Sequence, residues 1–598
     1  MKIRERIEGL RAEMNRQKID IYIIPSTDAH SSEYVGEYFK ARQYITGFTG
    51  SAGTAVFTKH KAALWTDGRY FIQAEQELTG TGITLCKSGE PDCDTIEQFL
   101  RKELPAGGTI GFDGRTMGVS EGKMYEEIAI EKAGTVHFQT DLVGRIWKDR
   151  PALPAEKAFL LAKRYTGEST ASKLERVRAF MDEKGADIHL LSSLDDIAWL
   201  LNVRGNDVAY CPLILSYLLL YKDHAEIYAD GRKFSEEIQK EFDKNNIFIH
   251  DYEQIYKAVE NLPKDSRILL DPGRVNYSLY QKIPGEVRMI EQENPEILMK
   301  CVKNHIEVKN IKNAHLKDAI AAIRFMRWLK KKAESGEIRA FSERSVSQKL
   351  EDFRRAQEGY LEASFEPISA FAEHGAIVHY SASEESNAPL DTGSLLLMDT
   401  GGHYLEGSTD ITRTFALGEV PKKQKEDFTL VARAMLRLMN TRFLYGCSGA
   451  NLDCIAREVF WKEKVNFNHG TGHGVGYLTN VHEAPISFRW KEGSQPAPVL
   501  ERNMVITDEP GIYLEGSHGI RLENELLVCA DEKNEYGQFM RFEPLTFVPI
   551  DLDAIVPEKM SAEEKKMLND YHSEVYRKTE SFLDAEEKEW LKRYTRPV

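Results

Sequence analysis

Cysteine is scarce and scattered in this chain of 598 residues. The seven cysteines are odd in number and include no Cys-x-x-Cys pair. Zinc fingers and disulfide-linked scaffolds are excluded, because both need closely spaced or paired cysteines. Unpaired thiols are typical of a reducing compartment, so we predict that the protein is cytoplasmic.

The chain also lacks an apolar run long enough to cross a membrane. The longest run, Val208 to Tyr221, has 14 residues, whereas a membrane-spanning helix needs about 20. This run predicts a buried pair of strands instead. The first 17 residues are charged and have no apolar core segment, so we expect an amphipathic helix and no signal peptide. No membrane partner is expected.

A surplus of positive charge is absent as well. The 79 lysines and arginines are outnumbered by 94 aspartates and glutamates, which gives a formal net charge of −15. Proteins that grip nucleic acid need basic side chains to neutralise phosphates, so nucleic acid is not an expected partner. The 42% of hydrophobic residues can fill several cores, and the length predicts about three to five domains.

A repeated pattern occupies the first half of the chain. Residues 6–24 align without gaps with residues 173–191, and their apolar positions coincide. In both copies a helical pattern leads into an apolar strand run. The segment LWTDGRYF at 64–71 is echoed by IYADGRKF at 227–234. Two copies of one α/β unit are therefore predicted.

A different kind of region follows the repeats. Residues 302–336 lack proline and have helical periodicity, so we expect a long helix there, and residues 422–445 predict a second. Short β-like runs lie between and after them, at Ser394–Asp399, Ile411–Ala416, Met504–Thr507 and Ile520–Val528. The predicted fold class is α/β and α+β, with two similar α/β N-terminal domains before a C-terminal domain. The predicted domains are residues 1–155, 156–305 and 306–598, the last with a helical C-terminal extension.

Acidic side chains in apolar contexts distinguish the third region. Asp399 ends the run SLLLMD, Asp410 lies in STDITRTF, Glu509 in MVITDEPG and Glu523 in GIRLENELLV. Burying an unpaired carboxylate costs several kcal/mol, so such a group needs an ion pair, a proton or a metal ion. His473 lies in HGTGHGVG, where the glycines let the backbone approach a bound group closely.

Four carboxylates and one imidazole together indicate a metal site. This donor set favours Mn²⁺, Fe²⁺, Co²⁺ or Zn²⁺ over an ion that prefers thiolates. Three acids and a histidine can serve one ion. Two bridging carboxylates would instead hold two ions roughly 3.5 Å apart, an arrangement that activates a shared water. A single acid of this kind more often forms a structural ion pair, so the prediction depends on the whole group.

Five segments of the third region resemble the pita-bread metallopeptidases, which include methionine aminopeptidase, prolidase and aminopeptidase P. The segments are, in order, MDTGGHYLEGSTDITRTF, HGTGHGVG, NVHEAP, TDEPGIY and GIRLEN. The doubled N-terminal unit, with YITGFTGSAGTAVFTKHKAALWTDGRYFIQAEQ, is similar to the long aminopeptidases P. The ligand order of the family is Asp, Asp, His, Glu, Glu. The resemblance implies five metal ligands: Asp399, Asp410, His473, Glu509 and Glu523.

The same resemblance implies a metalloaminopeptidase that hydrolyses the N-terminal Xaa-Pro bond of peptides by a hydroxide bridging two divalent metal ions. Mn²⁺ is the expected ion, with Zn²⁺ or Co²⁺ as alternatives. Asp410 and Glu523 would bridge both ions. The implied catalytic residues are Glu509, His482 and His379, and the implied substrate contacts are Arg69, His379 and His482. The expected partners are peptides with proline in the second position and a second copy of the chain in a homodimer.

Four further positions and three alternatives complete the prediction. Phe371, Ile377 and Tyr513 flank the motifs and are candidates for the proline pocket, and Arg521 is a candidate partner of a ligand carboxylate. A prolidase is disfavoured by the chain length and by the doubled N-terminal unit. A peptide-binding scaffold without chemistry, or a metal-free hydrolase of the creatinase kind, is disfavoured because all four acids and the imidazole are present.

Overall fold

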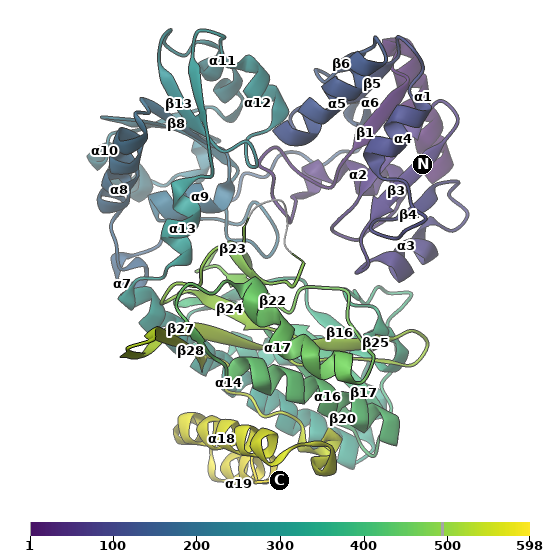
Figure 1. The fold of residues 1–598 in the computed structure, drawn as a ribbon, viewed down its shortest axis with the longest axis vertical. Helices are drawn as coiled ribbons and strands as arrows, with labels where there is room; N and C mark the ends of the chain where they lie inside the picture. Colours follow the sequence, from purple (N-terminus) through teal and green to yellow (C-terminus); the bar gives the residue numbers. More distant parts are fainter. Residues whose placement is uncertain (1, 492–495) are drawn as a thin grey trace. The chain divides into compact units, whose positions relative to one another are not determined.

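The computed structural model describes residues 2–491 and 496–598 of the chain. These residues form two compact units, which are described separately here (Figure 1). The first unit contains residues 1–162 and 168–297, and the second contains residues 163–167 and 298–598.

Two six-stranded mixed sheets with the same topology form the first unit. The first sheet has the order β4 (Thr84–Lys87), β3 (Ala62–Thr66), β2 (Thr54–Thr58), β1 (Ile21–Ile24), β5 (Thr109–Phe112) and β6 (Thr135–His137). The second has the order β12 (Ile247–His250), β11 (Ala225–Ala229), β10 (Ser216–Tyr221), β8 (Ile188–Leu191), β13 (Arg267–Leu270) and β14 (Arg288–Glu291). In each sheet the strand of the repeated segment is antiparallel to one neighbour and parallel to the other.

Helices flank both sheets and follow the same pattern. The first repeat has α1 (Ile3–Gln17), α2 (Ala41–Thr46), α3 (Phe71–Leu78), α4 (Ile96–Glu103), α5 (Val119–Glu131) and α6 (Leu142–Ile146). The second has α8 (Thr170–Lys184), α9 (Leu194–Leu201), α10 (Glu236–Lys244), α11 (Ile255–Glu260) and α12 (Tyr277–Lys282). Because α1 with β1 and α8 with β8 occupy the two aligned segments, the structure confirms the predicted pair of similar α/β domains.

The predicted strand pair in the apolar run from Val208 to Tyr221 is wrong. Only β10 is a strand there, and its neighbours are β8 and β11. Val208 and Cys211 close a short turn, and Pro212, which has no backbone N–H, cannot donate to a strand ladder. The run is nevertheless buried from Cys211 to Leu220.

The two repeats exchange core residues with each other. Ala29 and Phe39 of the first repeat are buried within the hydrophobic core of the second. In return, Tyr277 of the second repeat is fully buried in a core of the first, where its ring lies 5.4 Å from that of Phe112. The imidazole of His30 is also buried, hydrogen-bonded to the Ser192 carbonyl at 2.8 Å and to a tyrosine hydroxyl. Each repeat is therefore completed by the other.

Long helices and several antiparallel sheets form the second unit. Its helices are α7 (Lys163–Thr166), α14 (His305–Glu334), α15 (Glu343–Arg355), α16 (Lys422–Met439), α17 (Gly449–Lys462), α18 (Ala562–Thr579) and α19 (Ala585–Tyr594), while α13 (Pro295–Cys301) spans the boundary between the units. The helices α16 and α17 pack side by side (Figure 1). The amide side chain of Asn304 caps the start of α14, and Glu307 completes the capping box.

The strands of the second unit form four sheets. A three-stranded sheet has the order β16 (Ile368–Phe371), β17 (Ser394–Thr400) and β20 (Ile411–Leu417), and another has β15 (Tyr360–Ala363), β18 (Gly402–Tyr404) and β19 (Gly407–Ser408). A six-stranded sheet has the order β21 (Arg442–Leu444), β28 (Gly537–Pro544), β27 (Asn524–Asn534), β24 (Val505–Asp508), β22 (Gly472–Val475) and β23 (His482–Phe488). The strands β25 (Gly511–Leu514) and β26 (His518–Arg521) form a hairpin.

Two predicted boundaries of the second unit differ from the structure. The second long helix ends at Met439 rather than at 445, because the Asn440 side chain binds the Leu436 carbonyl at 2.8 Å and the chain then enters β21. The apolar run from Ile520 to Val528 is not one strand, since it breaks between β26 and β27 at Leu522 and Glu523. This break takes Glu523 out of the regular ladder.

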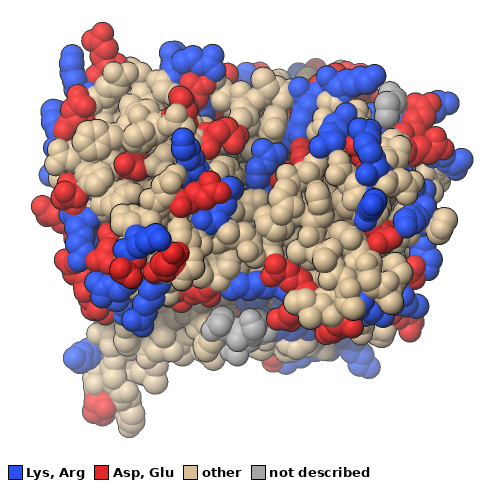
Figure 2. Space-filling view, turned by 90° about the horizontal axis from the view of Figure 1, so that it is seen from above, with Lys and Arg blue, Asp and Glu red and all other residues tan. Residues whose placement is uncertain are grey.

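The surface of the described residues carries charges of both signs. Figure 2 shows lysine and arginine interspersed with aspartate and glutamate over the face that it draws, so neither sign dominates that face. Among the described residues, no helix combines the length and the apolar character that crossing a membrane would require.

Candidate metal centre

The four acids selected from the sequence come from the ends of two antiparallel strand pairs. Asp399 lies near the end of β17, and Asp410 immediately precedes β20, which pairs with β17. Glu509 immediately follows β24, and Glu523 immediately precedes β27, which pairs with β24. The backbone N–H of Glu523 donates to the Thr412 carbonyl at 3.0 Å, which joins the two pairs. The fold thus gathers acids that are far apart in sequence.

Asp410, His473 and Glu523 form the centre of this group. One ligand atom of each lies within 4.8 Å of the others, a spacing that suits a metal ion. The Nε2 atom of His473 is 3.4 Å from Oδ2 of Asp410 and 3.7 Å from Oε1 of Glu509. These distances show that four of the five predicted ligands lie close together.

The hydrogen bonds of His473 define which of its nitrogens is available. Nδ1 donates to the Gly474 carbonyl at 2.8 Å, and the backbone N–H donates to the Thr507 hydroxyl at 3.0 Å. With the proton on Nδ1, the lone pair of Nε2 faces the carboxylates of Asp410 and Glu509. A lone pair that faces two carboxylates needs a proton or a metal ion between them, and a metal ion fits this arrangement.

The electrostatics of the acids agree with this interpretation. Burial raises the pKa values of Asp410 and Glu523 well above the usual range, and the neighbouring carboxylates raise these pKa values further. Burial also raises the pKa of Glu509, although His473 and Arg521 oppose the rise. Divalent ions would relieve the mutual repulsion of these carboxylates, which is the fit expected of a metal centre.

Asp399, the fifth predicted ligand, is held by Arg521. Its Oδ2 atom accepts a hydrogen bond from Nη2 of Arg521 at 2.6 Å, and both side chains are buried. Its Oδ1 atom is buried and has no hydrogen-bond partner among the described residues. An orphaned carboxylate oxygen beside three other acids is a further observation that fits a metal ligand. Arg521 thus binds the carboxylate of Asp399, which is one of the predicted ligands.

Sequence reasoning missed three residues that support the cluster. The Thr412 hydroxyl donates to Oε2 of Glu523 at 2.8 Å. The buried carboxylate of Glu525 accepts a hydrogen bond from the backbone N–H of Asp410 at 2.6 Å, and its other oxygen is 3.1 Å from Nε2 of His315. Glu525 is an acid in an apolar strand, so the signal that selected Glu523 was available for it too. No pattern in the sequence connects it with His315.

The two histidines predicted to contact substrate lie on different elements. His482 begins β23, opposite Val475 of β22, and its ring centroid lies 4.2 Å from that of His473 in an edge-to-face arrangement. His379 is half-buried in the segment after β16. The carbonyl of its neighbour Val378 accepts a hydrogen bond from Nη2 of Arg521 at 3.4 Å. One guanidinium therefore contacts both Asp399 and the backbone beside His379.

Arg69, the third predicted substrate contact, belongs to the first unit. Its guanidinium binds the Asp67 carboxylate through two hydrogen bonds of 2.8 Å. Arg232 of the second repeat binds Asp230 in the same way. The two differ in exposure, because the side chain of Arg69 is 25% exposed and that of Arg232 is 79% exposed. Arg69 is thus held in a defined orientation, whereas Arg232 extends into solvent.

The three candidates for the proline pocket have different surroundings. The Tyr513 hydroxyl is bound by Nη1 of Arg521 at 2.7 Å and by Nε2 of His469 at 2.9 Å. The hydroxyl of Tyr513 is therefore part of a polar network, so only the ring of Tyr513 could line an apolar pocket. Phe371 and Ile377 lie half-buried beside small hydrophobic clusters of the second unit.

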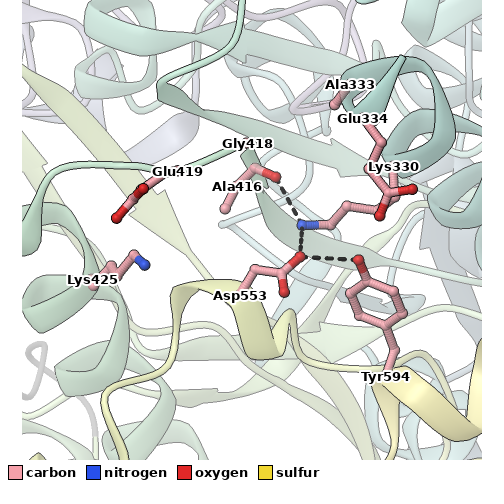
Figure 3. A pocket seen from close by; sticks show the side chains of 9 residues that line it. All are labelled: Lys330, Ala333, Glu334, Ala416, Gly418, Glu419, Lys425, Asp553 and Tyr594. Atoms are coloured by element: carbon pink, nitrogen blue, oxygen red, sulfur yellow. Dashed lines mark hydrogen bonds and ion pairs between the residues drawn. The ribbon is translucent and has the colours of Figure 1, made fainter. Parts of the chain in front are cut away.

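A separate pocket of about 280 Å³ shares no residue with the acid cluster. Its lining residues are Lys330, Ala333, Glu334, Ala416, Gly418, Glu419, Lys425, Asp553 and Tyr594. Figure 3 shows the Lys330 ammonium bound to the Ala416 carbonyl and to Asp553, which also accepts from the Tyr594 hydroxyl. These groups form their hydrogen bonds with one another. We therefore interpret the pocket as a gap in the packing of α19 against α14.

Comparisons with protein families match nearly the whole chain. The Creatinase/Prolidase N-terminal domain matches twice, at residues 6–142 and 149–307. The metallopeptidase family M24 matches residues 309–530, and the C-terminal region of peptidase M24 matches residues 538–598. The five predicted ligands lie within the M24 match.

Individual relatives match over most of their length as well. Aminopeptidase P2 of Arabidopsis thaliana is 35% identical, covering 97% of this chain and 86% of the relative. Xaa-Pro aminopeptidase 1 of Dictyostelium discoideum is 34% identical, covering 100% and 97%. The crystal structure of X-prolyl aminopeptidase from Caenorhabditis elegans, described as a cytosolic enzyme with a di-nuclear active site, is 32% identical, with a TM-score of 0.95 and full coverage of both chains.

Proposed function

Because this chain belongs to the metallopeptidase family M24, we propose that it is an aminopeptidase that releases the first residue of a peptide when proline stands second. One observation carries the proposal most: the acids and the imidazole of the cluster are all present and gathered in a chain that matches an X-prolyl aminopeptidase from end to end. The substrate class is a peptide with a free N-terminus. Proline in the second position is distinctive, since its peptide nitrogen carries no hydrogen.

The five proposed metal ligands are Asp399, Asp410, His473, Glu509 and Glu523. They would hold two divalent ions, with Asp410 and Glu523 shared between them, and we propose Mn²⁺ as the ion, with Zn²⁺ or Co²⁺ as alternatives. When bound, the ions supply a Lewis acid for the scissile carbonyl and a water that is acidic near neutral pH.

The chain's own residues would divide the remaining work. Glu509 would accept the proton of the attacking water on its carboxylate, which burial already makes more basic than usual. His482, whose ring contacts that of His473, would donate to the developing oxyanion. His379 would hold the peptide backbone and pass a proton to the proline nitrogen as it leaves. Arg521 would keep Asp399 oriented.

The remaining assignments extend the proposal to the whole protein. We propose that Arg69 contacts residues beyond the proline, which favours peptides longer than two residues. The domains would be residues 1–155, 156–305 and 306–598. A cytoplasmic location is supported by the description of the nematode enzyme as cytosolic and by the unpaired thiols. A homodimer is proposed by analogy with the long members of the family.

A prolidase, which cleaves only Xaa-Pro dipeptides, is the second candidate. The structure of the prolidase from Thermococcus sibiricus is similar to 64% of this chain, with a TM-score of 0.51 and 22% identity. At that identity only the fold is shared. The second α/β repeat and the full-length match to aminopeptidases P favour the aminopeptidase.

A peptide series separates the candidates. Purified protein loaded with Mn²⁺ is given X-Pro-Y, X-Ala-Y, acetyl-X-Pro-Y and X-Pro, and the products are identified by mass spectrometry. We expect release of X from X-Pro-Y alone among the three longer peptides. Equal cleavage of X-Ala-Y would remove the proline requirement, and cleavage confined to X-Pro would identify a prolidase. Metal analysis of the same sample should give two ions per chain.

A further inference from the structure

The segment from Phe371 to Ala388 is held to the second unit by one buried carboxylate. This segment, here called the His379 loop, follows β16 and includes the 3₁₀ helix η5 (Ala372–Ala376). The carboxylate belongs to Glu343, the first residue of α15, and it is completely buried. A buried carboxylate needs hydrogen-bond donors, and in this case all of the donors come from the loop.

Four donors converge on Glu343. Oε1 accepts from the backbone N–H of Phe371 at 2.7 Å and from Nδ1 of His374 at 2.8 Å. Oε2 accepts from the Tyr380 hydroxyl at 2.8 Å and from the backbone N–H of Ala388 at 2.9 Å. The donors include both ends of the loop and two side chains between them. Glu343 therefore fixes the path of the loop, and the bond to Glu343 raises the pKa of His374.

A second anchor lies on the side of the metal centre. Arg521, which binds Asp399, also donates to the carbonyl of Val378, the residue before His379. In addition, η5 packs against β26 backbone to backbone, so closely that a Cβ atom on Gly519 would lie 1.6 Å from the Gly375 carbonyl oxygen. His379 thus lies between an anchor that belongs to the acid cluster and the bonds made by Tyr380 and Ala388 to Glu343.

We propose that Glu343 is a positioning residue for substrate binding, which acts by holding the His379 loop in place. This inference rests on the proposed function for its link to peptide binding. Glu343 contacts none of the five proposed ligands in the hydrogen bonds and ion pairs described, so its effect is on the peptide and not on metal content. The carboxylate is the required group, because it offers acceptors only.

The test is the substitution Glu343→Gln. The amide keeps the size of the side chain but turns one acceptor into a donor, which then faces two donors of the loop. We expect KM for X-Pro-Y to rise roughly tenfold or more, with bound metal unchanged, because displaced contacts of this kind weaken binding strongly. A wild-type KM in the Glu343→Gln protein that does fold, with only the apparent kcat lowered, would overturn the proposal.

Glu351→Gln is the matched control. Glu351 lies on the same helix and also accepts a hydrogen bond from a tyrosine, Tyr360, at 2.7 Å, but that tyrosine belongs to β15. KM should stay at the wild-type value in this variant. Tyr380→Phe removes a single donor and should give a smaller rise in KM, which keeps the proposal testable if Glu343→Gln fails to fold.

A second measurement does not depend on activity. The exposed residues Glu384 and Glu385 lie in the loop, so a glutamate-specific protease can report on its mobility. Cleavage at these sites, mapped by mass spectrometry, should be faster in Glu343→Gln than in wild type and unchanged in Glu351→Gln. Equal rates in all three proteins would overturn the role of Glu343. Wild-type protein without Xaa-Pro activity would instead overturn the proposed function, and the cleavage rates would still decide the role of Glu343.

Discussion

At the scale of single residues, the metal centre depends on neutral side chains as much as on its acids. Thr412 illustrates this, because its hydroxyl donates to Glu523 and lies 3.3 Å from Nε of Arg521. It fixes the orientation of a carboxylate that is proposed to be shared by two ions. Partners of this kind typically account for a 10–100-fold difference in metal affinity or activity.

Thr412→Val should therefore lower the affinity for Mn²⁺ by roughly 10–100-fold while the protein stays folded. Valine keeps the shape of threonine but removes the donor to Glu523. The measurement is a metal titration of the demetallated protein by calorimetry. Thr579→Val serves as the control, since the buried Thr579 hydroxyl binds a carbonyl of its own helix, α18. Equal affinities in wild type and Thr412→Val would contradict the assigned role.

His374 gives the protein a pH-dependent contribution to stability. The hydrogen bond to Glu343 raises the pKa of His374, burial opposes the rise, and Glu373 adds to it. A histidine with a higher pKa in the folded state stabilises the fold fully below its unfolded pKa of about 6.5. This stabilisation is lost as the pH rises through the folded pKa.

The variant His374→Asn should therefore melt further below wild type at pH 5.5 than at pH 9. Asparagine can still donate a neutral hydrogen bond to Glu343, so the variant isolates the effect of the charge. Loss of the ring contact with Tyr380 lowers the melting temperature equally at both pH values. The same difference at both pH values would show that the charge contributes nothing.

Much of the candidate site was predictable from single residues, because acids are rare in apolar strand contexts. Asp399, Asp410, Glu509 and Glu523 share that signal, and the structure gathers them with His473. The supporting residues were not predictable. Glu343 precedes the first ligand by a long stretch of sequence and begins an ordinary helix, and only the folded chain shows that four loop donors meet there.

At the scale of elements, the hairpin of β25 and β26 connects the loop with the metal centre. It carries Tyr513 and Arg521, and it packs on η5 through two glycines, Gly375 and Gly519. The buried pair of His518 and Asp427, 3.1 Å apart, ties the same hairpin to α16. A side chain between the hairpin and the loop would push the His379 loop away from Arg521, one of its two anchors.

Gly519→Ala should destabilise the protein by about 3 kcal/mol or more and lower activity, because the added Cβ meets a backbone carbonyl that cannot give way. Gly516→Ala, in the turn of the same hairpin, is the control. It adds a Cβ where nothing lies within 4 Å, so it costs only about 1 kcal/mol for a left-handed backbone of φ +68°. Denaturant unfolding compares the two, and similar values would contradict the packing argument.

The spacing of apolar residues predicted an element well where one face of it stays buried along its length. It predicted poorly where the chain turns inside the hydrophobic core. It predicted the long helix α14 to within a few residues. It failed between Ile520 and Val528, since the residues of the break, Leu522 and Glu523, are as buried as the two strands that flank them. A similar reason explains why β10 was predicted to begin too early, since residues 211–215 before it are buried although they form no strand.

At the scale of the whole molecule, the two α/β repeats fold as one body. Phe39 of the first repeat fills the core of the second, and Tyr277 makes the reverse contact. Removing a buried phenylalanine typically costs about 3–5 kcal/mol, which is a large share of the stability of a small domain.

The fragment 149–297 should consequently be unstable alone, whereas the fragment 1–297 should unfold in a single transition. Without the first repeat, the second lacks Ala29 and Phe39 in its core and exposes Tyr277. Circular dichroism in the near ultraviolet and thermal melts of both fragments provide the measurement. A cooperative melt of 149–297 at the temperature of 1–297 would show that the exchange contributes little.

The reciprocal burial of Phe39 and Tyr277 also constrains how this architecture can evolve. Two copies that arose by duplication usually drift apart independently, but here a substitution in one copy changes the cavity that the other must fill. If the second repeat alone were transferred to another protein, its core would contain a cavity in place of Phe39, and the side chain of Tyr277 would be exposed to solvent. The unit that keeps both cores complete is therefore the pair of repeats and not the single repeat.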